Sequence, residues 1–205
     1  TLRNTGIEAG KQLTESWQPG ALLAPVPAVM VSCQDAKGGR PNIITLAWAG
    51  TVCSEPPMVG ISIRPGRHSY GIIKETGEFV INMPSSGQAF ATDYCGVTSG
   101  RKIDKFAATG LVAAPAEKVS TPIISDCPVN LECKVRQVVE LGTHHLFLAE
   151  VVAVQVSRLL VSHQGKLEME KAGLIAYAHG NYYELGRIIG HFGYSIRKRP
   201  VARKS

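Results

Sequence analysis

The fold class of this chain follows from the stretch Val129-Asn130-Leu131-Glu132-Cys133-Lys134-Val135-Arg136. Its odd positions are apolar and its even positions polar, which is the period of an antiparallel strand that buries one face. The segment 146–156 is rich in Val and Leu and follows a turn with Gly142. The two segments therefore predict a long hairpin whose second strand is buried on both faces. Because the alternation breaks at 137–139, we expect a β-bulge there.

Four short runs of β-branched residues lie upstream, at 26–33, 43–50, 58–63 and 78–82. Turns rich in Gly and Pro separate them, so the chain is expected to form about six strands. Short helices are expected between the strands, at 69–76, 85–95 and 102–108. No strand–helix–strand alternation recurs, so the sequence predicts a mainly β fold with short helices, either an antiparallel barrel or a sandwich.

The composition is that of a globular protein. The 205 residues are 44% hydrophobic and 19% charged, which excludes a disordered chain, a collagen-like repeat and a coiled coil. Charges, Gly or Pro interrupt every apolar run before the ~20 residues that a membrane helix needs, so we expect a soluble protein with no membrane partner. The predicted organisation is an N-terminal extension at 1–23, a main domain at 24–160 and a C-terminal extension at 161–205.

The net charge of +6 is concentrated at one end. Removing the basic tail leaves +1 for residues 1–196; the tail contains Arg197, Lys198, Arg199, Arg203 and Lys204. No aromatic residues that could stack on bases are interleaved with these charges, so we predict no nucleic-acid partner and interpret the tail as a solubilising end.

The five cysteines form no CxxC pair and are odd in number, which fits neither a disulfide framework nor a zinc site. They are interpreted as reduced thiols, and a cytoplasmic location is the corresponding expectation. The pair His144-His145 lies in the predicted hairpin turn, where adjacent side chains point to opposite sides, so no metal site is predicted. The sequence also lacks GxGxxG, P-loop, HExxH and GxSxG motifs, which leaves the common nucleotide, zinc-protease and hydrolase sites without support.

The loop Arg64-Pro65-Gly66-Arg67-His68-Ser69-Tyr70 resembles an anion cradle. Two guanidinium groups offer forked donors to phosphate, and the loop leads into a helix N-terminus, which favours negative charge. A charged loop without a ligand is an equally good interpretation. On the preceding strand Met58, Gly60 and Ser62 share one face, so either a flat group or a neighbouring strand is expected to pack there.

A second polar turn, 98–101, precedes Asp104 and Lys105. Together with Asn42, Thr45 and Trp48, the two loops suit a ligand with a phosphate at one end and a planar heteroaromatic group at the other. Taken alone, Trp48 is more simply interpreted as a residue of the core.

Ordered motifs along residues 24–195 resemble the flavin reductase-like family, specifically its flavoredoxin branch. They include Ser99-Gly100-Arg101-Lys102-Ile103-Asp104-Lys105-Phe106, Asp126-Cys127-Pro128-Val129-Asn130-Leu131-Glu132-Cys133 and the segments 42–58, 64–70, 77–82 and 182–186. The resemblance implies a six-stranded antiparallel Greek-key split β-barrel that dimerises and holds FMN non-covalently near the subunit interface. The domain at 24–160 would be this barrel, and 161–205 would supply dimer contacts.

The resemblance also implies the cofactor-binding residues. Asn42, Thr45 and Trp48 would line the isoalloxazine. Arg64, Arg67 and Ser69 would take the phosphate. Ser99, Asp104 and Lys105 would close the site, and Asn82 would lie beside the flavin. Apart from the resemblance, a cation near the ring would favour the anionic reduced flavin, and Lys105 is the candidate for this tuning role; a surface lysine on a helix is the alternative. Ile43, Ser62 and Tyr70 complete the implied set. No catalytic side chain is expected, because FMN carries the redox chemistry.

The implied function is an FMN-binding oxidoreductase of the flavin reductase or flavoredoxin type, supplied by NAD(P)H or by a protein electron donor. The segment 42–48 lacks the small-residue Ser-x-x-Pro pattern of diffusible flavin reductases, which favours a retained FMN. A ferric-complex reductase and a non-enzymatic FMN storage or sensing protein are the alternatives. A homodimer is expected because Tyr182, Tyr183, Ile188, Ile189 and Phe192 would otherwise be exposed.

Overall fold

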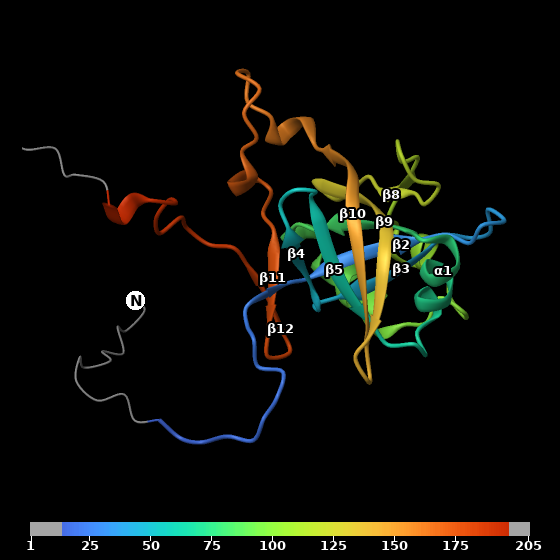
Figure 1. Ribbon diagram of the computed structural model, residues 1–205. Coiled ribbons are helices and arrows are strands. Elements are labelled where there is room, and N and C mark those ends of the chain that lie inside the picture. Colours follow the sequence, from blue (N-terminus) through green and yellow to red (C-terminus); the bar gives the residue numbers. More distant parts are fainter. Residues whose placement is uncertain (1–13, 197–205) are drawn as a thin grey trace, which may run out of the picture.

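The structure is a computed structural model that describes residues 14–196 (Figure 1). The predicted basic tail from residue 197 lies outside the described residues. The strands are β1 (Val26–Pro27), β2 (Val29–Cys33), β3 (Asn42–Leu46), β4 (Ala49–Cys53), β5 (Met58–Ile63), β6 (Glu78–Met83), β7 (Ala113–Ala114), β8 (Ile123–Ile124), β9 (Val129–Glu140), β10 (His145–Val156), β11 (Ile175–Ala178) and β12 (Asn181–Glu184). The helices are α1 (His68–Thr76), α2 (Ala89–Val97) and α3 (Lys105–Thr109), with short 3-10 turns η1 (Ser86–Gln88), η2 (Arg158–Leu160), η3 (Met169–Lys171) and η4 (Tyr194–Ile196).

An antiparallel sheet in the order β3-β2-β6-β9-β10-β5-β4 forms the body of the protein. Its two outermost strands, β3 and β4, are consecutive in the chain and are joined only by Ala47 and Trp48. The N–H of Ser62 in β5 donates to the carbonyl oxygen of Trp48 over 2.9 Å. The predicted strand 43–50 is thus one strand bent in the middle, and its two halves close the sheet into a six-stranded barrel. The predicted fold class is confirmed.

The long hairpin β9–β10 is confirmed, with its bulge slightly earlier than expected. The register passes from Leu148↔Gln137 to Ala149↔Val135, which leaves Arg136 as the extra residue. The expectation that β10 is buried on both faces is wrong, because its side chains are mostly half-buried apart from Phe147 and Ala149. One face of β10 fills the barrel, whereas the other is only partly covered.

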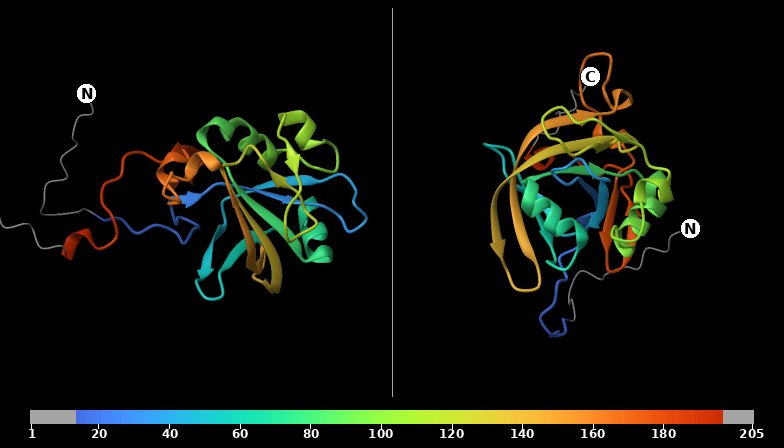
Figure 2. Two further views of the ribbon diagram at one scale, coloured as in Figure 1. Left: turned by 90° about the horizontal axis from the view of Figure 1, so that it is seen from above. Right: turned by 90° about the vertical axis from the view of Figure 1, so that its right-hand side faces the viewer.

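The core has two main parts, on either side of β2 and β3. Inside the barrel lie Phe79, Phe147, Ile61 and Val31, with Ile73 of α1 closing one end. On the outer side a second cluster packs against α2 and α3; it contains Met30, Ile43, Cys95, Phe106 and Ile124. Successive residues of a strand point to opposite faces, so β2 and β3 supply both clusters. In Figure 2 the strands enclose the barrel core and α2 and α3 lie outside it.

A second, three-stranded sheet has the order β1-β11-β12. The predicted strand 26–33 is divided at Ala28, since β1 pairs with β11 and β2 pairs with β3 and β6. Residues 14–24 and 185–196 form two arms that leave this sheet on the same side of the body (Figures 1 and 2). Within residues 14–196, none of the helices has the length and apolar character needed to cross a membrane.

Candidate functional site

Two adjoining hollows that share Ile44, Arg67 and Gly96 form a continuous trough over β3. We call one part the aromatic end; its other lining residues are Thr45, Leu46, Ala47, Trp48, Ser62, Ile63, Arg64, His144 and Tyr177. We call the other part the cationic end; it is completed by Asn42, Gly66, His68, Ser69, Cys95, Thr98, Ser99, Gly100 and Lys105. The trough therefore has chemically different ends.

The cationic end is built on the start of α1. Arg67 is the N-cap residue, with extended backbone angles, and the first turn carries His68 and the buried Ser69. The side-chain amide of Asn42 donates to the Ser69 hydroxyl over 2.7 Å, which fixes α1 against β3. Free N–H groups at a helix N-terminus, together with the helix dipole, attract anions. The predicted anion cradle thus has the local geometry that this chemistry needs.

Lys105 lies at the floor of the cationic end and is only 3% exposed. Its Nζ donates to the carbonyl oxygens of Ile43 and Cys95, both at 2.6 Å. Burial lowers the pKa of Lys105, and the neighbouring Arg67 acts in the same direction. Because both partners are uncharged, the ammonium charge is not neutralised by them and can stabilise an anion bound in the trough.

Arg40, Arg67, Arg101 and Lys105 give the cationic end a positive electrostatic field. Burial lowers the pKa of His68, and Arg101, Lys105 and Arg40 lower it further. The Nη2 of Arg40 also donates to the carbonyl oxygen of Gly100 over 2.9 Å, which ties the loop after α2 to the turn between β2 and β3. Several cations thus surround a small polar hollow, the arrangement expected for a phosphate-binding site.

The aromatic end is lined by apolar, aromatic and charged side chains. Trp48 lines it and is 39% exposed, so its interpretation as a core residue is wrong. His144 lies on the opposite rim, where its Nε2 accepts from Nε of Arg64 over 3.4 Å. Burial lowers the pKa of His144, followed by the effects of Arg64 and Arg67. Ile44, Leu46 and Ile63, with the Trp48 and Tyr177 rings, offer apolar and aromatic surface that suits a flat heteroaromatic group.

The structure brings most of the predicted site residues together. Nine of them line the trough: Asn42, Thr45, Trp48, Ser62, Arg64, Arg67, Ser69, Ser99 and Lys105. Two of these nine residues, Arg64 and Lys105, line a different end of the trough from the one predicted. Arg64 lines the aromatic end and not the phosphate-like end, and Lys105 lines the cationic end and not the part beside Trp48. Lys105 lies at the cationic end because α3 packs against the start of β3, at the opposite end of the strand from the bend at Trp48.

Four predicted residues do not line the trough. The Asn82 amide is buried in β6, where it donates to the Met30 carbonyl and accepts from the N–H of Ile124. Ile43 points into the core beneath α2, and only its carbonyl reaches Lys105. Tyr70 packs in the barrel with its hydroxyl against His145 Nδ1, and Asp104 caps α3 through Ala107 N. Each of these side chains already has a structural role.

The surroundings of Gly60 show whether a flat group or a neighbouring strand packs on the small-residue face of β5. A β-carbon on Gly60 would lie 3.1 Å from Leu146 Cδ1 and 3.3 Å from Val52 Cγ1. Close packing of neighbouring strands therefore explains Gly60. Ser62, two residues on, lines the trough instead.

Sequence reasoning missed Gly96, His144 and Tyr177. Gly96 carries no motif, and Tyr177 is brought to the trough by β11, more than 100 residues away from β3 in the chain. His144 was considered only as a metal ligand. The expectation that His144 and His145 point to opposite sides is confirmed, since His145 contacts Tyr70 and His144 lines the trough. Among residues 14–196, no three His, Cys, Asp or Glu side chains gather as metal ligands would.

Comparison with known proteins places this chain among flavin proteins, both by sequence and by structure. A family model described as "Flavin reductase like domain" matches residues 22–186. The solved structure of flavoredoxin from Desulfovibrio vulgaris (Miyazaki F) superposes with a TM-score of 0.84 at 31% identity, covering 90% of this chain and all of that one.

Two curated relatives are similar in sequence. An uncharacterised protein of Archaeoglobus fulgidus is 35% identical over 115 residues, which are 56% of this chain and 65% of that protein. The FMN reductase (NADH) RutF of Pseudomonas syringae pv. syringae is 27% identical over 128 residues, or 62% of this chain and 69% of that protein.

Proposed function

Since this chain belongs to the flavin reductase-like family, we propose that its trough holds FMN non-covalently and that the protein is an FMN-dependent oxidoreductase. When bound, FMN supplies the redox chemistry, taking up electrons from a donor and passing them to an acceptor. The relative from Pseudomonas syringae is named an FMN reductase that uses NADH, which supports a nicotinamide nucleotide as the donor.

The observation that carries this proposal is the polarity of the trough. Arg67 and the buried Lys105, with the start of α1, offer charge and donors for a phosphate at one end. Trp48, Ile44 and Tyr177 offer apolar and aromatic surface for a flat ring at the other end. FMN has these two parts in the same order, whereas riboflavin lacks the phosphate.

The residues of the chain bind, orient and shield the cofactor. Arg67 lines both ends and can hold the phosphate while bordering the ring. Gly96 has no side chain, and a β-carbon there would lie 3.3 Å from Thr45 Cβ, so glycine lets α2 approach β3 and form the second wall of the trough. Because Lys105 is at the cationic end, its expected effect is on the affinity for the phosphate. We therefore assign Lys105 to phosphate binding in place of the predicted tuning of the ring.

The proposal is tested by the visible spectrum and by anaerobic reduction. Purified protein should bind FMN and show flavin absorbance, and adding NADH or NADPH without oxygen should bleach it. Bound FMN that neither nucleotide bleaches, and that no reduced electron-transfer protein bleaches either, would favour a storage or sensing protein. Protein that cannot be loaded with FMN would contradict the proposed cofactor. Ferric complexes are tested as acceptors in the same cuvette.

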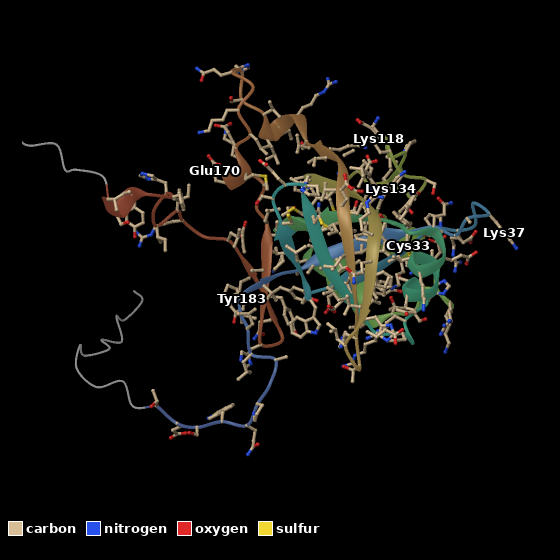
Figure 3. The ribbon with its side chains drawn as sticks, viewed as in Figure 1. Cys33, Lys37, Lys118, Lys134, Glu170 and Tyr183 are labelled. Carbon is tan, nitrogen blue, oxygen red and sulfur yellow. The ribbon has the colours of Figure 1, made fainter. Side chains whose placement is uncertain are left out.

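We further propose a cytoplasmic homodimer. The edge of β12 is unpaired within the described residues, and Tyr183 on it is 52% exposed (Figure 3). Exposed strand edges and large apolar patches commonly mark interfaces between subunits. The four buried cysteines remain reduced in such a compartment. Sedimentation equilibrium at micromolar concentration tests the assembly, and a monomer would contradict it.

A further inference from the structure

The hairpin β11–β12 supplies part of the wall at the aromatic end of the trough, although it belongs to the small sheet and not to the barrel. Tyr177 of β11 is the residue of this hairpin that lines the trough. Within the described residues, neither β11 nor β12 pairs with a strand of the main sheet. The position of the Tyr177 ring therefore depends on the side chains that hold the hairpin against the barrel.

The Tyr177 ring packs against Tyr182 of β12. The two residues are direct partners across the hairpin, and their ring centroids lie 5.6 Å apart with the ring planes inclined by 63°. Such an edge-to-face arrangement favours one orientation of each ring over others. Tyr182 is half-buried and is not among the residues that line the trough. It can therefore act on a bound ligand only through its neighbour.

Tyr182 also connects the hairpin to α2. Its hydroxyl group donates to Oδ1 of Asp93 over 3.3 Å. Burial, followed by the Asp93 carboxylate, raises the pKa of Tyr182 to about 12, so the phenol retains the proton that it donates. The residue before Asp93 is Thr92, whose carbonyl oxygen accepts from the Thr45 hydroxyl of β3. Adjacent residues of α2 thus bond to the floor of the trough and to the hairpin.

The base of the hairpin is attached separately. The Ser86 N–H donates to the Gly173 carbonyl oxygen over 2.8 Å, and the Ser86 hydroxyl donates to Oε1 of Glu184 over 3.1 Å. These contacts lie at the end of the hairpin away from its turn, whereas the contact of Tyr182 with Asp93 lies nearer the turn. Loss of the Tyr182 contact should therefore leave the hairpin attached and release only the part that carries the Tyr177 ring.

We propose that Tyr182 and Asp93 are positioning residues of the flavin site. Their hydrogen bond joins two walls of the aromatic end, α2 and the β11–β12 hairpin, and fixes the Tyr177 ring beside the isoalloxazine. Neither side chain contacts the cofactor. The inference rests on the proposed FMN site and adds to it that a pair of residues outside the trough sets the geometry around the ring.

The first test is Tyr182→Phe, which removes only the hydroxyl group. The dissociation constants of FMN and riboflavin should both rise, by the same factor of about two to ten, because the ring end is affected and the phosphate end is not. With FMN at saturation, the visible circular dichroism of the bound flavin should also change, whereas a merely structural role would lower the melting temperature without moving that spectrum. Tyr183→Phe is the matched control, since Tyr183 is the next residue on the opposite face of β12; affinity and spectrum should stay as in the wild-type protein.

The second test changes the acceptor. Asp93→Ala should reproduce the effect of Tyr182→Phe, and the double variant should be no weaker than either single one, because the same hydrogen bond is lost in all three. Asp93→Asn keeps an acceptor oxygen and should bind both flavins nearly as well as the wild-type protein. Since Ala and Asn both remove the negative charge, the difference between these two variants isolates the hydrogen bond from any effect of charge on the phosphate.

The third test asks whether Tyr182 acts through Tyr177. In a Tyr177→Leu background, adding Tyr182→Phe should cause no further loss of flavin affinity. An undiminished loss in that background would overturn the proposal, as would wild-type affinity and spectrum in both Tyr182→Phe and Asp93→Ala. Failure of the wild-type protein to bind FMN would instead overturn the proposed function, so the two failures are distinct.

Discussion

Gly96 of α2 lies so close to Thr45 of β3 that a β-carbon on Gly96 would be 3.3 Å from the Thr45 Cβ. The Thr45 hydroxyl donates to the carbonyl oxygen of Thr92, one turn earlier in α2. The helix is thus held directly against the strand at the waist of the trough, where its two ends meet.

Gly96→Ala should therefore weaken FMN binding without weakening the fold. Alanine is a better helix former than glycine by up to ~1 kcal/mol, which offsets the cost of the close approach to Thr45, so the melting temperature should change little. The added methyl group narrows the waist, and the FMN dissociation constant should rise by about tenfold. Gly71→Ala in α1, where nothing lies within 4 Å of the new methyl group, should stabilise the protein and leave FMN binding unchanged. Equal affinities in the two variants would mean that FMN does not cross the waist.

Arg67→Ala and Trp48→Ala should affect different parts of the cofactor. A charge-assisted hydrogen bond to phosphate contributes roughly 1.5 to 3 kcal/mol, so Arg67→Ala should weaken FMN about 10- to 150-fold. Riboflavin, which has no phosphate, should be affected much less. Trp48→Ala should weaken both ligands, because it removes surface beside the ring. Fluorescence quenching titrations measure all four constants, and equal losses for FMN and riboflavin in Arg67→Ala would place the phosphate elsewhere.

Glu132→Gln should destabilise the protein in a pH-dependent manner. The fully buried carboxylate accepts from the N–H groups of Glu117 and Lys118 at 2.9 and 2.6 Å and from Gln155. Burial alone would raise the pKa of Glu132, but these donors outweigh burial and lower it below its ordinary value of 4.5. The stabilisation is thus present above about pH 4.5 and is lost as the pH falls through the lowered pKa.

Urea unfolding at pH 7 should show a loss of about 1 to 3 kcal/mol for Glu132→Gln, and the difference from the wild-type protein should shrink towards pH 3. Glu150→Gln, which removes a surface ion pair with Arg136, should cost less than about 1 kcal/mol at either pH. A constant difference for Glu132→Gln across this range would show that the loss arises from packing and not from ionisation.

Only Cys53 should react readily with a thiol reagent in the folded protein. Cys33, Cys95, Cys127 and Cys133 are buried, and Figure 3 labels Cys33. Burial raises the pKa of Cys33 and of Cys95 to about 11 and that of Cys133 to about 12, and it raises the pKa of Cys127 as well. Thiolates react and thiols do not, so these four should be slow.

A colorimetric thiol titration should therefore find one fast thiol in the native chain and five after unfolding. Cys53→Ser should abolish the fast phase and leave reduction of bound FMN by NAD(P)H within about tenfold of the wild-type rate, since we assign the thiol no part in the chemistry. Loss of reduction in a folded, FMN-loaded Cys53→Ser variant would reveal a thiol step.

Local pattern determined the elements of this protein. The alternation at 129–136 identified β9, and the Gly- and Pro-rich turns separated the remaining barrel strands, because the side chains of a strand repeat every two residues and the sequence records this directly. The Arg64–Ser69 loop was identifiable as a candidate anion site for a similar reason. Its charges, glycine and helix start are adjacent in the chain, so their chemistry needs no long-range contact.

Tertiary structure alone decided how these elements combine. The bend at Ala47 and Trp48 divides one predicted strand into β3 and β4, which together close the barrel. The Ser62 N–H donates to the Trp48 carbonyl oxygen at this bend, and no local sequence pattern encodes that hydrogen bond. Asn82 and Tyr70 look like polar site residues in sequence, yet strand register directs Asn82 into the core and the packing of α1 directs Tyr70 into the barrel. Tyr177 reaches the trough through the pairing of β1 with β11. Polar residue types are visible in a sequence, but the face on which each side chain lies depends on pairing between distant segments, and only the fold specifies that pairing.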